Sequence, residues 1–409
     1  MDLDALRRKY AEIVVKTAIN LQEGEPLLIR AEVVQREFSK ILAEVAYSMG
    51  ASSVSLQYTD PELIRLRIDK TLDGNNLKFM PSHLENMYDC YLKDGWSSIS
   101  LRGPESPDIM EGADPVRLGK FSRANSIVMR KFLKGISSNR IAWNVCLHPT
   151  EAWAAKVLGS SENWEKRIWE VLVPILRLDR DDPAGAWLDH DTELKRRCGH
   201  MNRARYDRIH FTGPDTDLYI GMAPDRVFAG GRCVNQKGVE FFPNIPTEEI
   251  FSTPDHTRTE GFVKTTRPVE VLGTQVTGAW FRFSAGQVVE FGADTNREML
   301  EQYLNFAAGA RALGEVALVD VNSPIFRSGK IFYNILFDEN AACHIALGNG
   351  YPDCIENGTR MSDDELKETR CNSSLVHTDF MIGSEDISAF GVKQDGSEEK
   401  IIEHGLFVI

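Results

Sequence analysis

The sequence predicts an α/β protein with a doubly wound N-terminal domain and a C-terminal α+β domain rich in antiparallel sheet. Three observations support this. Helix and strand patterns alternate in the first half, short strand patterns separated by glycine and aspartate dominate the second, and the chain has 409 residues. Because single hydrophobic cores stop growing at about 250 to 300 residues, we expect two domains. We place them at residues 1–205 and 206–409.

The first half reads as helices followed by short apolar strands. Apolar residues recur at helical spacing from Leu6 to Leu21 and from Phe38 to Met49. Strands that alternate with helices pair in parallel through crossovers, so this pattern predicts a doubly wound sheet. The expected strands are 26–31, 53–58, 97–101 and 140–145, and the further expected helices are 117–133 and 164–176.

The second half carries strand patterns without intervening long helices. Residues 284–286 read as a hairpin loop between two strands. One helix is expected at 297–310, and a strand-rich stretch begins at Phe332. The other expected strands are 208–211, 217–220, 269–272, 276–283 and 287–291.

Composition excludes several classes of partner. The formal net charge of -13 disfavours nucleic acid and anionic membrane surfaces. No apolar run approaches the roughly 18 residues of a spanning helix, and the charged start does not read as a signal peptide. The seven cysteines form no CxxC pair and read as reduced thiols. We therefore expect a cytoplasmic protein without nucleic-acid or membrane partners.

The candidate chemistry lies between residues 240 and 380. HExxH, GxSxG and P-loop motifs are missing from the sequence. His377 and Asp379 form an H-x-D pattern in an apolar stretch, and the period of two places both on one strand face. Taken alone, this pattern is better explained by an interior histidine and a turn acid.

Acidic residues and a second histidine stand in apolar surroundings nearby. Asp338, Glu339 and His344 lie in LFDENAACHIALGNGY, Glu315 opens LGEVALV, and Glu249 precedes an apolar pair. Burying such charges is costly unless they are paired or bind metal. A salt bridge or a helix cap explains any one of them. A metal centre explains them together.

These segments carry a family resemblance. PNIPTEE, FSTPDHTRTEG, LGEVALV, FDENAACHIALGNGY and HTDFMIG occur in this order, and KYAEIVVKTAINLQEGEPLLI extends the likeness to the first half. The chain resembles the M29 metallopeptidases, the thermophilic-type aminopeptidases. The resemblance implies a homodimer that acts on short peptides with a free N-terminus, a catalytic role for Tyr351, and a pair of divalent metals in the C-terminal domain. The implied metal ligands are Glu249, Glu315, Glu339, His344, His377 and Asp379.

This ligand set has oxygen and nitrogen donors without thiolate, which suits zinc, cobalt, manganese or magnesium. Two such metals can activate a water as the nucleophile. By resemblance Glu315 bridges them. A neighbouring carboxylate, Glu249 or Glu339, would take the proton of the water, and the sequence does not decide between the two. Tyr351 would stabilise the oxyanion, although a packed aromatic is an equal alternative from sequence alone. Glu248 adjoins Glu249, and only one of the two can face the metals.

Two other functions fit parts of the pattern. An iron-dependent dioxygenase that opens hydroxylated pyridine rings has the same fold, and a site of histidine and carboxylate also serves Fe(II). A non-catalytic protein that binds a small ligand would need no pair of metals. Metal content together with release of amino acids from peptides separates these alternatives.

Overall fold

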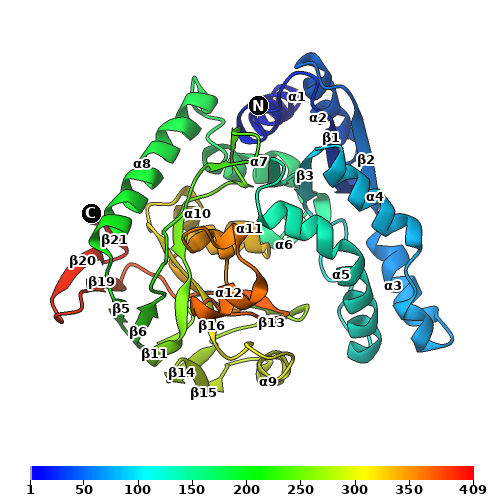
Figure 1. Ribbon diagram of the computed structural model, residues 1–409. Coiled ribbons are helices and arrows are strands. Elements are labelled where there is room, and N and C mark those ends of the chain that lie inside the picture. The colour runs from blue at the N-terminus through cyan, green and yellow to red at the C-terminus, as the bar shows by residue number, and fades with distance from the viewer. Residues whose placement is uncertain (1) are drawn as a thin grey trace. The chain divides into compact units, whose positions relative to one another are not determined.

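The computed structural model describes residues 2–409 (Figure 1). Contacts between residues divide the chain into two compact units. The first comprises the chain up to Ala186 together with Arg232–Ile245, and the second comprises Trp187–Gly231 and Pro246–Ile409. Helix α8, Pro183–Ala204, contains the first of these boundaries. The division into domains 1–205 and 206–409 remains a proposal. Residue 205 lies between the end of α8 and the first strand that follows it.

The first unit contains a parallel sheet in the order β2-β1-β3-β4-β9. Its neighbouring strands run parallel, and the order reverses between β1 and β3, as in doubly wound folds. The predicted fold class is confirmed here. The strands are β1 Leu27–Glu32, β2 Val54–Thr59, β3 Ser97–Arg102, β4 Trp143–Leu147 and β9 Asn244–Ile245, and a separate hairpin joins β7 Cys233–Val234 to β8 Glu240–Phe241.

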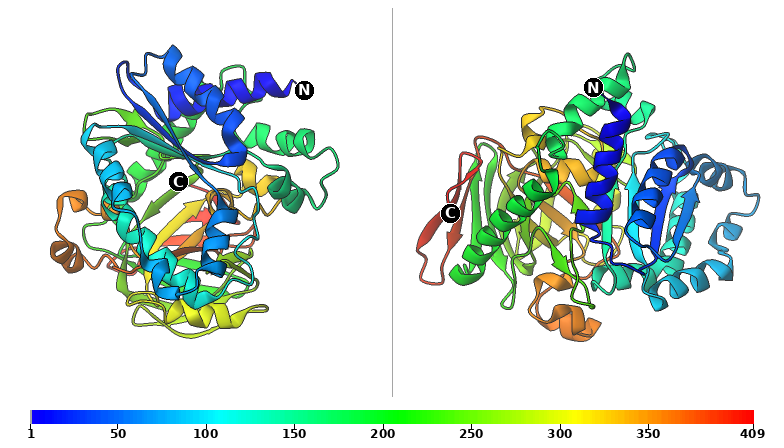
Figure 2. Two further views of the ribbon diagram at one scale, coloured as in Figure 1. Left: turned by 90° about the vertical axis from the view of Figure 1, so that its right-hand side faces the viewer. Right: turned by 90° about the horizontal axis from the view of Figure 1, so that it is seen from above.

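Helices flank the parallel sheet, as Figures 1 and 2 show. Leu28 of β1 packs with Tyr88 of α4 and Phe132 of α5. Helix α5 begins before the predicted 117, because Asp114 caps it by accepting from the Val116 and Arg117 N–H groups at 2.8 and 3.1 Å. The helices are α1 Leu3–Glu12, η1 Ile13–Ala18, η2 Val33–Gln35, α2 Arg36–Ser48, α3 Pro61–Lys70, η3 Gly74–Lys78, α4 Ser82–Lys93, α5 Pro115–Ser137, α6 Glu151–Leu158 and α7 Trp164–Ile175.

The second unit contains a large antiparallel sheet and a smaller one that we call the site sheet. The large sheet has the order β15-β14-β11-β6-β5-β19-β20-β21, and the site sheet has the order β10-β16-β17-β18. Antiparallel pairing in this half was predicted and is confirmed. The strands are β5 Arg208–Gly213, β6 Thr216–Met222, β10 Glu249–Ser252, β11 Pro254–Lys264, β12 Val269–Val271, β13 Thr274–Val276, β14 Trp280–Ser284, β15 Gln287–Gly292, β16 Leu313–Val319, β17 His344–Gly348, β18 His377–Met381, β19 Ser388–Val392, β20 Glu398–Glu403 and β21 Leu406–Phe407.

The predicted hairpin at 284–286 is present, since Ser284 of β14 pairs with Gln287 of β15. The helix predicted at 297–310 is shorter and ends at Leu304. In the described part of the chain, no helix has both the length and the apolar content needed to cross a membrane. The helices of this unit are α9 Arg297–Leu304, α10 Pro324–Arg327, α11 Ile335–Asp338, η4 Glu339–Ala341, η5 Pro352–Cys354, η6 Gly358–Arg360 and α12 Asp363–Glu368.

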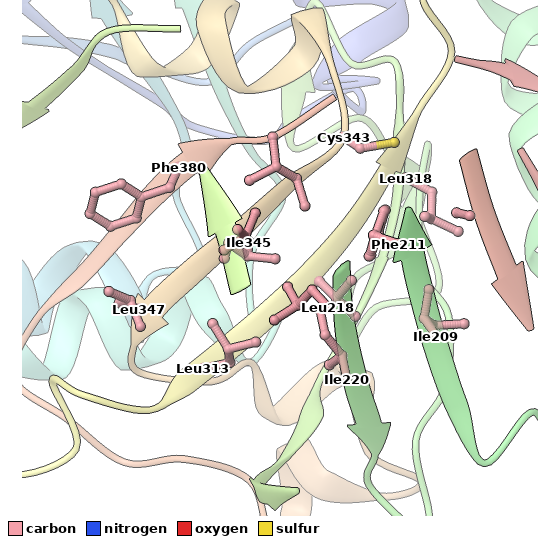
Figure 3. Packing of buried hydrophobic residues seen from close by; sticks show 14 of the residues in the cluster. Ile209, Phe211, Leu218, Ile220, Leu313, Leu318, Cys343, Ile345, Leu347 and Phe380 are labelled. Atoms are coloured by element: carbon pink, nitrogen blue, oxygen red, sulfur yellow. The ribbon is translucent and has the colours of Figure 1, made fainter. Parts of the chain in front are cut away.

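An apolar core fills the space between the site sheet and the large sheet (Figure 3). Leu313, Ile345 and Leu347 of the site sheet are buried in one cluster with Phe211 and Leu218 of the large sheet. One face of the site sheet therefore packs against the apolar core. Its other face does not contact this core and can carry polar groups.

Candidate metal centre

The strand register places the predicted ligands on one face of the site sheet. Residues paired directly across antiparallel strands lie on the same face. Ala346 of β17 pairs with Glu315 of β16 on one side and with Asp379 of β18 on the other. His344 pairs with Ala317, two residues after Glu315, and Glu249 of β10 pairs with Val319. His377 lies two residues before Asp379, so it shares their face as the H-x-D pattern predicted.

The alternate residues of the same strands face the core. Val316 and Leu318 of β16, Ile345 of β17 and Phe380 of β18 belong to the apolar cluster. Cys343 also belongs to it, and its Sγ lies 3.4 Å from the backbone N and O of Val319. The alternation of side chains along each strand thus places apolar residues on the core face and polar residues on the other face. Cys343 lies on the core face, away from the ligands.

The polar face gathers two overlapping groups of potential metal ligands. Glu249, Glu315 and His344 form one group, and Glu315, His377 and Asp379 form the other, with the ligand atoms of each group within 4.8 Å of one another. His344 Nε2 lies 3.3 Å from Glu249 Oε2, and His377 Nε2 lies 3.3 Å from Glu315 Oε2 and 3.2 Å from Asp379 Oδ1. Glu315 is common to both groups.

The donor chemistry of these groups fits divalent cations. Within residues 2–409, Glu249 Oε2 and Asp379 Oδ1 are buried oxygens, and the histidine Nε2 atoms at 3.3 and 3.2 Å from them are not aligned for a hydrogen bond. Such atoms are costly in a folded protein unless a cation or an ordered water satisfies them. Both histidines also have their Nδ1 atoms near backbone carbonyls, at 3.3 Å from Ala342 O for His344 and 2.8 Å from Asn349 O for His377. That arrangement directs each Nε2 toward the carboxylates, as in histidines that bind metal.

Burial and crowding of charge shift the pKa values in this cluster. Burial raises the pKa of Glu249 to about 8, with His344 opposing the shift and Glu315 adding to it. Burial and the charge of Glu249 raise the pKa of Glu339 well above its usual range. Burial disfavours the charge on His377, but Asp379 and Glu315 outweigh it and raise the pKa of His377 well above its usual value. The metal-free cluster therefore holds protons that a divalent cation would displace.

The whole chain matches known proteins. The model of the thermophilic metalloprotease (M29) family matches residues 4–407. The chain belongs to the M29 family. Aminopeptidase 2 of Geobacillus stearothermophilus is 36% identical over 97% of this chain and 96% of its own length. Aminopeptidase T of Thermus aquaticus is 35% identical over 98% of both chains. Wild-type AmpT from Thermus thermophilus, a solved structure, has a TM-score of 0.93 and 33% identity and covers 100% of both chains.

The predicted catalytic tyrosine of this M29 chain lies beside the second ligand group. The Tyr351 Oη atom is 3.3 Å from His377 Nε2, and its ring meets the rings of His377 and Phe251 edge-on at 5.0 and 5.7 Å between centroids. Burial, followed by the nearby carboxylates, raises the pKa of Tyr351 well above its usual value. Its hydroxyl therefore stays protonated and can donate a hydrogen bond.

The other acids of the M29 motifs have separate positions. Glu339 lies at the start of η4, and its burial, followed by the charges of Glu249 and Asp379, raises its pKa. Asp338 lies elsewhere, because its carboxylate accepts from the Phe332 and Asn334 N–H groups at 2.9 and 3.1 Å. Glu248 Oε2 lies 3.3 Å from His190 Nε2. Of the adjacent acids 248 and 249, Glu249 is the one in a ligand group.

One buried amide that sequence reasoning missed joins two segments of the M29 site. Asn340 Oδ1 accepts from the Glu248 N–H at 2.7 Å, and Asn340 Nδ2 donates to Leu336 O at 2.9 Å and lies 3.4 Å from Glu339 Oε1. Asn340 is fully buried. It thereby fixes the backbone next to Glu249 against the turn that carries Glu339. The two segments are 92 positions apart in the sequence, so no local sequence pattern predicts their contact.

Backbone crowding also shapes this site at Gly314. A β-bulge separates the Leu313–Leu347 pair from the Glu315–Ala346 pair, and Gly314 is the extra residue. A Cβ atom at Gly314 would lie 2.2 Å from Asn349 O and 2.5 Å from Gly348 O. Only glycine lets β16 approach the loop before Tyr351 this closely.

Proposed function

We propose that this M29 protein is a metal-dependent aminopeptidase that removes N-terminal residues from short peptides at a site for two divalent ions. One observation carries the proposal: two ligand groups on the same sheet face share Glu315. A carboxylate that belongs to both groups is suited to bridge two ions, which is the arrangement of co-catalytic metal sites. The names of the relatives, Aminopeptidase 2 and Aminopeptidase T, support the reaction class.

The proposed ligands comprise the two groups and the nearby Glu339. All of them offer oxygen or imidazole nitrogen, so zinc, cobalt, manganese and magnesium are the candidate ions. The carboxylates outnumber the imidazoles, and two cations would offset the negative charge that, after burial, raises the pKa values of Glu249 and Glu339. The proposed ligands are Glu249, Glu315, Glu339, His344, His377 and Asp379.

Metal ions of this kind supply a Lewis acid and a water of lowered pKa when bound. The protein supplies the proton transfers and the orientation. Glu249 or Glu339 accepts the proton of the attacking water, since both carboxyls lie in the cluster beside the other ligands. Tyr351 donates a hydrogen bond to the oxyanion that develops on the scissile carbonyl, because its hydroxyl remains protonated beside the ligands.

The free amino terminus of the substrate has a natural counterpart in this site. An ammonium group is attracted by a surplus of carboxylates, and contact with them would place the first peptide bond beside Tyr351. We include in the proposal a cytoplasmic homodimer that acts without nucleic acid or membrane, in keeping with the M29 resemblance and the net charge of -13. Neither the dioxygenase nor the non-catalytic alternative is favoured by the names of the relatives.

The test compares free peptides with N-acetylated ones. The purified protein is expected to release amino acids from short free peptides and to leave the acetylated peptides intact. A chelator should abolish the release, and addition of Co²⁺ or Zn²⁺ should restore it. Equal cleavage of blocked and free peptides would remove the exopeptidase assignment, and full activity after verified metal removal would remove the metal.

A further inference from the structure

A buried threonine lies where the chain passes from the site sheet to the large sheet. Thr253 follows β10, which carries Glu249, and precedes Pro254, the first residue of β11. A residue before proline is restricted to extended backbone conformations, so the direction of Thr253 is fixed locally. Its side chain is fully buried. A hydroxyl in that position needs hydrogen-bond partners.

Two partners of this hydroxyl are the backbone groups of Tyr351, and the Cys371 side chain is a third. Thr253 Oγ1 donates to Tyr351 O at 3.1 Å and accepts from the Tyr351 N–H at 3.3 Å. One side chain thus holds the donor and the acceptor of a single residue 98 positions away. Tyr351 O also accepts from the Cys354 N–H at 3.1 Å, which closes the turn that follows.

The loop that carries Tyr351 is anchored residue by residue. The Asn349 N–H donates to Val376 O at 2.7 Å, and the Gly350 N–H donates to Asn372 O at 2.9 Å. At Tyr351 the anchor changes from a backbone carbonyl to the Thr253 hydroxyl. The Tyr351 backbone is therefore held by the hydroxyl of Thr253. A substitution can remove this hydroxyl without altering the backbone hydrogen bonds of Asn349 and Gly350.

The ring of Tyr351 depends on this anchor for its position. Phe251 meets the edge of the ring, and the Oη atom lies 3.3 Å from His377 Nε2. Phe251 and Thr253 are two positions apart on the same segment, so this segment contacts Tyr351 at its ring and at its backbone. A shift of the backbone would move the hydroxyl away from the ligand group while the ligands stay in the site sheet.

We propose that Thr253 is a positioning residue that holds the Tyr351 hydroxyl beside the metal ligands through its two hydrogen bonds to the Tyr351 backbone. This inference rests on the proposed function, in which Tyr351 stabilises the oxyanion. The Thr253 hydroxyl bonds to the backbone of Tyr351 and is not a member of either ligand group. Its loss should affect the rate of the chemical step rather than the binding of metal.

The test compares Thr253→Val, which keeps the shape and loses the hydroxyl, with Thr253→Ser, which keeps the hydroxyl. With the free tripeptide that the wild-type protein hydrolyses fastest, we expect kcat of Thr253→Val to fall about 10-fold to 100-fold, since small misplacements of catalytic groups cost that much. Thr253→Ser should keep kcat within about threefold. The dissociation constant for Co²⁺, measured by competition with a chelator, should be unchanged in both. Thr253→Ala is the substitute if the valine variant does not fold.

A double-substitution series shows whether the effect passes through Tyr351. In a Tyr351→Phe background, Thr253→Val should lower kcat by no more than about twofold, because residues that act as a unit are not additive. Full kcat in Thr253→Val, or the same loss in both backgrounds, would overturn the inference.

A crystal structure of metal-free Thr253→Val gives a readout that does not depend on activity. We expect the Tyr351 Oη atom to lie beyond hydrogen-bond distance of His377 Nε2. If Tyr351 has not moved, the positioning role of Thr253 is overturned. Absence of peptide hydrolysis by the wild-type protein would instead refute the proposed function, and the structure would still decide the role of Thr253.

Discussion

Glu315 and Asp379 lie on the same face of the site sheet, each directly paired with Ala346 of the strand between them. The small side chain of Ala346 is fully buried between the two carboxylates. The width available to a cation in this part of the centre therefore depends on a methyl group.

The first prediction enlarges that methyl group. In Ala346→Leu, the added atoms should occupy the ligand side and reduce bound metal to a small fraction of the wild-type content, with about 1 to 3 kcal/mol of destabilisation from overpacking. Plasma emission analysis after gel filtration measures the metal. Ile345→Leu, one residue away on the core face, is the matched control and should keep its metal. Full metal content in Ala346→Leu would contradict the assigned face.

The second prediction concerns the ligand shared by both groups. Glu315→Gln removes a charge from each group, whereas His344→Ala removes a ligand from one. We expect Glu315→Gln to weaken the binding of both ions and His344→Ala to weaken mainly one. Titration of the metal-free variants with Co²⁺, followed by calorimetry, measures the two binding steps. Equal behaviour of the two variants would speak against Glu315 as a bridge.

The third prediction separates Tyr351 from the ligands. Tyr351→Phe keeps the ring packed against Phe251 and loses only the hydroxyl. Its metal content should be that of the wild type, and kcat should fall about 10²-fold to 10³-fold, as for other oxyanion donors. Steady-state kinetics on a free peptide measures the loss. Retention of full turnover would leave Tyr351 as a packed aromatic.

The fourth prediction is a pH dependence of the metal-free protein. Burial raises the pKa of Glu249 from 4.5 to about 8, so the folded protein favours the protonated carboxyl. This contribution to stability is complete below about pH 4.5 and is lost as the pH rises through about 8. The free energy of unfolding should therefore decline between about pH 5 and pH 9.

Urea denaturation across this range measures the decline. Glu249→Gln has no proton to lose at that position, so its curve should be flatter. Saturating metal should also flatten the curve of the wild-type protein, because the cation replaces the proton. A wild-type curve that rises with pH in the absence of metal would contradict the direction of the shift.

The fifth prediction concerns the buried amide of Asn340. Removing it in Asn340→Ala leaves the Glu248 N–H and Leu336 O without their partner. A buried group left unsatisfied costs about 1 to 3 kcal/mol, so we expect a loss of stability of that size. Thermal unfolding with and without metal measures it. Ser323→Ala, which removes a single hydrogen bond to Asn340 O, is a milder control.

Local patterns predict much of this molecule. Alternation of helix and strand was enough to predict the parallel sheet, and the period of two was enough to place His377 and Asp379 on one face. The return of Arg232–Ile245 to the first unit was missed, because its strands are two residues long and carry no periodic signal. Thr253 and Asn340 were missed for another reason. Each meets a partner more than 90 positions away, through a contact that only the folded chain creates.

The close backbone contact at Gly314 couples the positions of two segments. The strand that bears Glu315 and the loop before Tyr351 are in direct backbone contact there, so a shift of one requires a shift of the other. Any larger residue at position 314 would require Asn349 to move away, and Asn349 O is the group that orients His377. Selection for catalysis would thus act on a glycine that has no reactive atom of its own.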